Sequence, residues 1–322
     1  MANKAHSCCK DYFLKRELAG RSARPTQAQA IPYRPLQPTQ ASVVESGAMA
    51  PTLLSDLALA RRLERTEGTA NARFVEARAR VAPETGARWM EVAGAYAMFD
   101  GVASPCTQTF GLGLFQMPTA AEMDAIEAFF REREAPVIHE VSPLADAEIL
   151  PLLSGRGYHP VELTTVMFLE LREWEKPGAQ DRSAVKVRAI GEAERAVWAR
   201  TSAAGWSESA ELAAMMEGFG KVAAATEGNV PFLAELDGQP IATGGLAVHG
   251  GLALFAGAST IPQWRRRGAQ QALLEHRFHY AQDAGCDLAM MCTAPGSASQ
   301  RNAERQGFRI AYTRIKWGLR EG

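Results

Sequence analysis

The fold of this chain is decided by one stretch at residues 256–274, which reads Ala256-Gly257-Ala258-Ser259-Thr260-Ile261-Pro262-Gln263-Trp264-Arg265-Arg266-Arg267-Gly268-Ala269-Gln270-Gln271-Ala272-Leu273-Leu274. It predicts a strand up to Pro262, a short basic loop, and a helix with an apolar face. The first turn of a helix has unpaired backbone N–H groups and a dipole that favours negative charge, so a pyrophosphate can bind there. Gly268 lets the backbone approach phosphate oxygens, and the three arginines add positive charge. A solvated basic turn is the alternative interpretation.

The segments that follow extend this pattern. We expect a helix over 268–284 that ends at Gly285, a strand over 288–293, a helix over 298–306 and a closing strand over 308–319. This order resembles the GNAT superfamily of N-acetyltransferases, whose signature after the fourth strand is Arg/Gln-x-x-Gly-x-Gly/Ala. Arg265 and Gly268 match that signature, whereas Gln270 departs from its last position.

The resemblance implies a cosubstrate and a binding site. The cosubstrate is acetyl-CoA, and no metal is implied. In the family, strands around the thioester splay apart, so the backbone of Ala258, Ser259 and Thr260 would bind the pantetheine arm. The backbone N–H groups of Arg266, Arg267, Gly268, Ala269, Gln270 and Gln271 would bind the pyrophosphate, and Ser297 and Asn302 would contact the distal part of CoA. Strand pairing and helix capping by Ser297 are the alternatives.

The implied reaction is direct attack on the thioester by a primary amine of a small molecule or peptide (an acyltransferase of class EC 2.3.1). The protein would position the reactants and polarise the thioester carbonyl. Many family members carry a proton-donating Tyr where this chain has Ala303. Tyr312 is the nearest hydroxyl in the sequence, with packing on the closing strand as its alternative. Glu208 and Glu211 are interpreted as surface residues, so no base is assigned.

Two other functions stay open. The missing Tyr favours a non-catalytic acyl-CoA-binding regulatory module, and a third hypothesis is a structural pseudo-enzyme that binds no ligand. Nothing in the sequence names the acceptor or specifies an oligomeric state.

The first half of the chain repeats the order of the second. Ala120 opens a helix 37 positions before Gly157, and Ala269 opens one 38 positions before Gly307. We therefore expect an α/β (α+β) protein of two tandem GNAT-like domains, each a mixed central sheet flanked by helices, at residues 49–172 and 184–322 with a linker at 173–183. The first half lacks the basic loop, and Glu122 at its helix start opposes a bound anion. We interpret this half as a degenerate domain that serves as a scaffold.

Other elements are expected from local patterns. A helix over 53–67 is predicted to stop at Gly68, and strands are predicted over 89–99 and 108–115. Residues 1–48, rich in Pro, Gln, Ser and Thr, are predicted to be a disordered extension, with translation starting at Met49.

The composition excludes several classes of protein. The net charge of -1 gives no reason to expect a nucleic-acid partner, and no apolar run is long enough to span a membrane. The five scattered cysteines favour free thiols in a reducing compartment, so we expect a cytoplasmic protein. For Cys8-Cys9, an unstructured tail is favoured over a metal or lipid site because no ligand partners follow.

Overall fold

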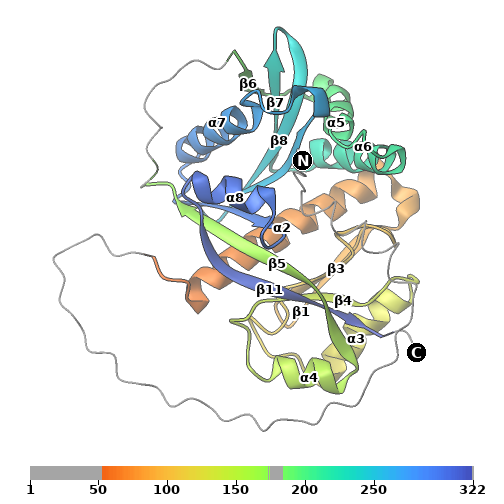
Figure 1. Ribbon diagram of the computed structural model, residues 1–322. Coiled ribbons are helices and arrows are strands. Elements are labelled where there is room, and N and C mark those ends of the chain that lie inside the picture. The colour runs from red at the N-terminus through yellow and green to blue at the C-terminus, as the bar shows by residue number, and fades with distance from the viewer. Residues whose placement is uncertain (1–52, 173, 175–183, 321–322) are drawn as a thin grey trace, which may run out of the picture.

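The computed structural model describes residues 53–172, 174 and 184–320. Eleven strands of these residues form one sheet in the order β1-β2-β3-β4-β11-β5-β10-β9-β8-β7-β6, and helices cover both of its faces (Figure 1). The expected extension 1–48, the expected start at Met49 and almost all of the expected linker 173–183 lie outside the described residues. The domain boundaries therefore stay predictions.

The order of elements repeats between the two halves. The N-terminal half contains α2 (Leu57–Val81), β1 (Arg88–Val92), β2 (Ala95–Phe99), β3 (Gln108–Phe110), α3 (Ala120–Arg131), β4 (Ile138–Val141), α4 (Ile149–Gly155) and β5 (Tyr158–Glu170). The C-terminal half contains β6 (Lys186–Ala189), α5 (Arg195–Ala204), α6 (Ala210–Ala225), β7 (Asn229–Leu236), β8 (Gln239–His249), β9 (Leu252–Thr260), α7 (Ala269–Asp283), β10 (Leu288–Thr293), α8 (Ala298–Arg305) and β11 (Arg309–Leu319). The mixed α/β class is confirmed, and so is the repeated helix–strand–helix–strand frame.

The two halves exchange their closing strands. Strand β5 of the N-terminal half pairs antiparallel with β10, and β11 of the C-terminal half pairs antiparallel with β4. The strands β5 and β11 also pair with each other, so both cross the middle of the molecule (Figure 1). One parallel pair lies on each side of them, β3 with β4 and β9 with β10. The sequence led us to expect one central sheet in each half. The structure shows a single continuous sheet, because each half completes the other.

The side-chain alternation along the strands assigns the helices to two faces. On β5, Val166 and Phe168 pack in a cluster with residues of α2, whereas Met167 and Leu169 pack in a cluster with residues of α7. On β7, Leu233 packs with residues of α5 and α6. The face with α2, α5 and α6 is called the α2 face below, and the face with α3, α4, α7 and α8 the α7 face. No helix of the described residues is long and apolar enough to cross a bilayer.

Helix α2 is longer than the sequence pattern suggested. We expected it to end near Glu67, but it continues through Gly68 to Val81, so that prediction was wrong. Gly68 allows α2 to lie close to the Tyr96 ring of β2, since a Cβ atom there would lie 3.1 Å from that ring. The longer helix reaches across the sheet from the C-terminal half to the N-terminal half and contacts both α6 and β1.

The two early strands were also predicted too long. The expected strand 89–99 is a hairpin of β1 and β2, which turns at Ala93 and Gly94 with φ of 51° and 74°. The expected strand 108–115 ends at Phe110, because Gly111 and Gly113 take φ of 78° and 73° and turn the chain away. Because β3 ends early, it is much shorter than β9, the equivalent strand of the C-terminal half.

Candidate active site

The loop between β9 and α7 presents a row of unpaired backbone donors. Gly268 caps α7 with a φ of 82°, and no side chain caps the helix start. Arg266 is also left-handed, with a φ of 64°. Among the described residues, none accepts a hydrogen bond from the backbone N–H groups of 266–271. Alternating backbone conformations and a helix N-terminus together form a concave surface that attracts anions.

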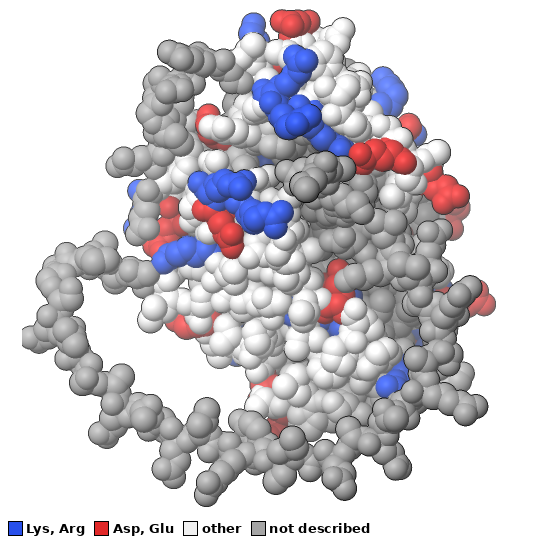
Figure 2. All heavy atoms as spheres, in the orientation of Figure 1, with Lys and Arg blue, Asp and Glu red and all other residues white. Residues whose placement is uncertain are grey.

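The arginines of this loop divide into two roles. Arg266 and Arg267 are exposed, and the Arg267 guanidinium lies 5.0 Å from the centre of the Trp264 ring. Figure 2 shows Lys and Arg side chains gathered over the beginning of α7 and over α8. Arg265 instead turns inward and donates to the Gly205 carbonyl at 3.1 Å and to the Glu208 carboxylate at 3.2 Å. Its contacts hold the α5–α6 connection against the loop.

Strands β9 and β10 separate beside this loop. They pair only over Leu252–Leu254 with Leu288–Met290, while β9 continues to Thr260 with β8 alone. A bulge with Gly257 at a φ of 63° interrupts the β8–β9 pairing. Residues 256–258 are exposed, so the backbone around Ala258 faces open space. This is the splayed arrangement that the sequence resemblance implied.

The neighbouring predicted residues hold the structure around the gap. The Ser259 hydroxyl donates to the Ser202 carbonyl at 2.8 Å, and the Thr260 hydroxyl accepts from the Gln270 amide at 2.6 Å. Gln270, which departs from the signature, therefore ties the first turn of α7 to the end of β9. Gln271 is exposed and donates to Glu275.

Helix α8 carries the two predicted contacts to the distal part of CoA. Ser297 caps the helix by accepting from the Gln300 backbone at 3.1 Å, which is the capping role we considered as its alternative. Asn302 is exposed and accepts from Arg305. Ala303 is buried in the core between α7, α8 and the sheet. The α8 side chain that lines the nearby cavity is Ser299, a hydroxyl that the sequence analysis missed.

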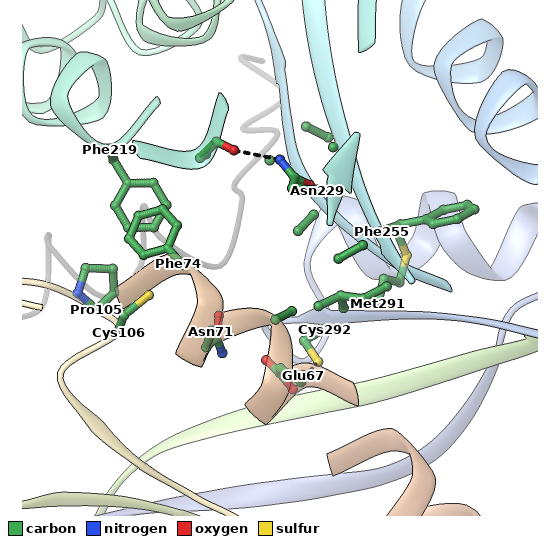
Figure 3. Close-up of a pocket in the computed structure, with 18 of the residues that line it drawn as sticks. Glu67, Asn71, Phe74, Pro105, Cys106, Phe219, Asn229, Phe255, Met291 and Cys292 are labelled. Atoms are coloured by element: carbon green, nitrogen blue, oxygen red, sulfur yellow. Dashed lines mark hydrogen bonds between the residues drawn. The ribbon is translucent and has the colours of Figure 1, made fainter. Parts of the chain in front are cut away.

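A cavity of about 330 Å³ passes through the gap in the sheet. Phe255 and Met291 line its end on the α7 face, which we call the cofactor end (Figure 3). Asn71, Phe74 and Phe219 line its end on the α2 face, which we call the acceptor end (Figure 3). Two reactants can therefore approach the gap from opposite faces of the sheet.

An ionic cluster lies beside the cavity where the two halves meet. Arg314 of β11 forms ion pairs with Glu64, Glu67 and Glu140 at 3.2, 2.7 and 3.2 Å. Lys316 forms ion pairs with Glu140 at 3.5 Å and with Glu162 at 3.0 Å. All members of this cluster except Glu64 line the cavity. Burying so many charges away from water costs free energy. That cost is offset only if each charge has a well-placed partner of opposite sign.

The pKa values of Glu64 in the cluster and of the neighbouring Cys292 thiol are both strongly shifted. Burial raises the pKa of the Glu64 carboxyl to about 7, against the opposing effect of Arg314. Burial also raises the pKa of the Cys292 thiol, and the neighbouring Glu67 carboxylate adds to the shift. The Cys292 thiol donates to Glu67 at 3.2 Å, and Figure 3 shows the two side chains pointing toward each other.

Tyr312, the sequence candidate for a proton donor, does not line the cavity. Its hydroxyl donates to Glu64 at 2.9 Å, and its ring packs under α2 with 7% of the residue exposed. The contacts show the packing role that we considered as its alternative. The sequence analysis also missed Glu67, because the predicted helix ended there and gave no reason to place Glu67 on a face with Asn71.

Arg277 is a second buried cation, and it lies on the α7 face. It donates to the carbonyls of Leu273 and Gly245, and its guanidinium lies 4.9 Å from the centre of the Phe255 ring. Among the described residues, no carboxylate pairs with it. Burial lowers its pKa to about 10, so it keeps its charge at neutral pH.

The splayed parallel pair, the basic loop and the helix that begins at Gly268 together form the arrangement that the sequence resemblance implied. Residues 194–308 match the family model described as the acetyltransferase (GNAT) family, so the C-terminal half of this chain is a GNAT domain. The N-terminal half lies outside that match. A comparison of the sequence with curated proteins finds no match.

Solved structures agree with a tandem GNAT fold. The chain resembles a GCN5-related N-acetyltransferase from Kribbella flavida with 18% identity and a TM-score of 0.56, covering 78% of this chain and 96% of that one. It also resembles a tandem GNAT protein from the clavulanic acid biosynthesis pathway with 12% identity and a TM-score of 0.50, covering 71% and 78%. A conserved protein of unknown function from Staphylococcus epidermidis gives 9% identity and a TM-score of 0.50, covering 71% and 92%. At these identities the likeness concerns the fold.

Proposed function

We propose that this protein transfers an acetyl group from acetyl-CoA to a primary amine of a small molecule or peptide. One observation carries the proposal: unpaired backbone donors at residues 266–271 follow the part of β9, residues 255–260, that has no partner on β10. A pyrophosphate at the start of α7 places the pantetheine arm along the free edge of β9. The thioester then lies at the gap in the sheet, within reach of the acceptor end of the cavity.

The reaction needs one bond made and one bond broken. The neutral amine attacks the thioester carbonyl carbon, the C–N bond forms, and the C–S bond breaks to release the CoA thiolate. A backbone N–H near Ala258 stabilises the charge on the carbonyl oxygen. The amine loses its proton on the acceptor side, where Glu67 lines the cavity. The thiolate regains a proton, for which Ser299 is the hydroxyl on α8 that faces the cavity.

Titration of acetyl-CoA into the protein by calorimetry tests this proposal. Gly268→Glu should weaken binding at least about 100-fold, because it adds a carboxylate and a side chain where the phosphates belong. The matched control is Gly285→Glu at the other end of α7, a residue with a similar φ of 74°. Gly285→Glu should keep the wild-type affinity. Absence of acetyl-CoA binding by the wild type would reject the proposal.

A non-catalytic acyl-CoA-binding module is the second candidate. It is favoured by Ala303, which is buried where the family often carries a proton-donating Tyr. Release of free CoA thiol in the presence of an amine panel separates the two functions, since a binding module releases none. A cytoplasmic location also remains a proposal, which the free thiols of Cys286 and Cys292 support.

A further inference from the structure

The acceptor end of the cavity carries more negative than positive charge. The ionic cluster contains four carboxyl groups, Glu64, Glu67, Glu140 and Glu162, and two cations, Arg314 and Lys316. Three of these carboxyl groups line the cavity. An excess of negative charge in a low-dielectric site is unfavourable, so a cation that enters this end is stabilised.

Two of the cations that line the cavity belong to the ionic cluster. Arg314 and Lys316 both form ion pairs within the cluster. Arg277 lies toward the cofactor end, against the Phe255 ring. Arg73 and Glu227 also line the cavity, and Arg73 packs against Gly228 beside Glu227. With Glu227 and Arg73 included, four carboxyl groups and three cations line the cavity on this side. An acceptor with its own carboxylate would thus meet an excess of like charge at the acceptor end.

The wall opposite the cluster is apolar. The rings of Phe74 on α2 and Phe219 on α6 lie 4.4 Å apart, and Trp198 of α5 closes the wall beside Gly257. Figure 3 shows Phe74 and Asn71 on the same helix as Glu67, one turn after another toward α6. A molecule seated here has a charged group at Glu67 and an apolar body against α6.

We propose that the acceptor is an organic ammonium without a carboxylate, whose charged nitrogen pairs with Glu67 and whose apolar body lies between α2 and α6. This inference rests on the proposed acetyl transfer for its chemical meaning, but the binding step can be measured without it. Glu67 lies beside the gap, because the thiol of Cys292 on β10 donates to it at 3.2 Å. Ammonium binding at Glu67 brings the nitrogen to the gap from the face opposite to acetyl-CoA.

A pair of matched probes tests the proposal. Phenethylamine and phenylalanine differ only in the carboxylate, and each is titrated by calorimetry into the full chain, alone and saturated with CoA. Phenethylamine should bind at least about 10-fold more tightly than phenylalanine. Equal affinities, tighter binding of phenylalanine, or no binding of either probe in both states would overturn the proposal.

Variants of α2 locate the site. Glu67→Gln should weaken phenethylamine binding about 10-fold. Glu76→Gln, the same change on an exposed residue of the same helix, should leave it unchanged. Since Glu67→Gln also disturbs Arg314, Asn71 provides an independent check: Asn71→Asp should strengthen and Asn71→Lys should abolish phenethylamine binding. Unchanged affinity in all these variants would place the ammonium elsewhere and overturn the assignment.

The two proposals fail in different ways. If Glu67→Gln still binds acetyl-CoA but no longer binds the amine, the result supports both the transferase and the ammonium site. Amine binding without acetyl-CoA binding would reject the transferase and leave the ammonium site standing. Acetyl-CoA binding with transfer to phenylalanine as fast as to phenethylamine would support the transferase and overturn the ammonium site.

Discussion

The helices α3 and α7 occupy equivalent places in the two halves, yet their first turns differ. At α3, Thr119 accepts from the Glu122 backbone, and the Glu122 carboxylate accepts from the Thr119 backbone at 2.7 Å. These hydrogen bonds from Thr119 lower the pKa of Glu122, so the helix start carries its own anion. At α7, Gly268 leaves the donors without a side-chain cap. The same frame thus offers an anion site in one half and occupies it internally in the other.

The strands that precede these helices, β3 and β9, also differ in how far they are paired with the next parallel strand. Strand β3 ends at Phe110, and only Thr109 and Phe110 pair with β4. Strand β9 runs six residues past its last partner on β10 and leaves a free edge. The N-terminal half contributes other parts to the site, namely Glu67 on α2 and the carboxylates of β4 and β5. Under the proposed function, the C-terminal half binds the cosubstrate and the N-terminal half contributes to the acceptor side.

The largest expected effect comes from separating the halves. Residues 184–322 produced alone should not fold, because β5 is missing between β10 and β11. Four consecutive residues of β5, Val166 to Leu169, are buried on both faces. Each is worth about 1.5–3 kcal/mol, and the sum is comparable with a total stability of about 5–15 kcal/mol.

Circular dichroism in a urea titration checks this prediction. The full chain should unfold in one cooperative transition, and addition of residues 53–172 should restore structure to the isolated C-terminal half. A C-terminal half that unfolds cooperatively by itself and binds acetyl-CoA would show that the two halves are independent domains after all.

A second expected effect concerns Glu64, which joins the two halves through Arg314 and Tyr312. Its pKa is about 7 in the folded protein and lies near 4.5 in the unfolded chain. Between these values the folded state retains a proton that the unfolded state has lost, so this group lowers stability as the pH rises from about 4.5 to 7. Glu64→Gln removes that loss, which amounts to about 3 kcal/mol at most.

Urea unfolding of both proteins at pH 5 and pH 8 measures the effect. The variant should gain stability relative to the wild type at pH 8 compared with pH 5, while the Gln side chain can still accept from Tyr312. A difference between the two proteins that does not change with pH would mean that Glu64 titrates normally.

The sequence predicted the elements around the cofactor end well because their signals are local. The bounds of β10 were predicted to the residue, since it is a short apolar run bounded by turn residues. The loop at 265–268 was found from adjacent arginines and a glycine. The acceptor end was missed, because its parts come from α2, β4, β5 and β11, whose proximity depends on the strand exchange. No local pattern distinguishes a strand that completes its own half from one that completes the other.

A third prediction transfers the acidic residue of α3 to α7. Gln271 stands three residues after Gly268, as Glu122 stands three residues after Thr119. Gln271→Glu should weaken acetyl-CoA binding about 10-fold, because its carboxylate lies where the phosphates are expected to bind. Gln271→Ala loses the same hydrogen bond to Glu275 without adding charge and should bind nearly as well as the wild type. Equal weakening by both changes would point to the hydrogen bond instead of the charge.

The smallest expected effect tests the other side of the comparison. Thr119→Ala removes the cap of α3 and should lower the free energy of unfolding by about 1 kcal/mol, as for other helix caps. It should not change the affinity for acetyl-CoA or the stoichiometry of one site per chain, because the N-terminal half has no open gap between β3 and β4. Calorimetry and urea unfolding on the same preparation measure both quantities. If uncapping α3 created a second acetyl-CoA site, the capping box itself would be what keeps the N-terminal half from binding. The early end of β3 would then not be the cause. An unchanged single site assigns the difference between the halves to their strands.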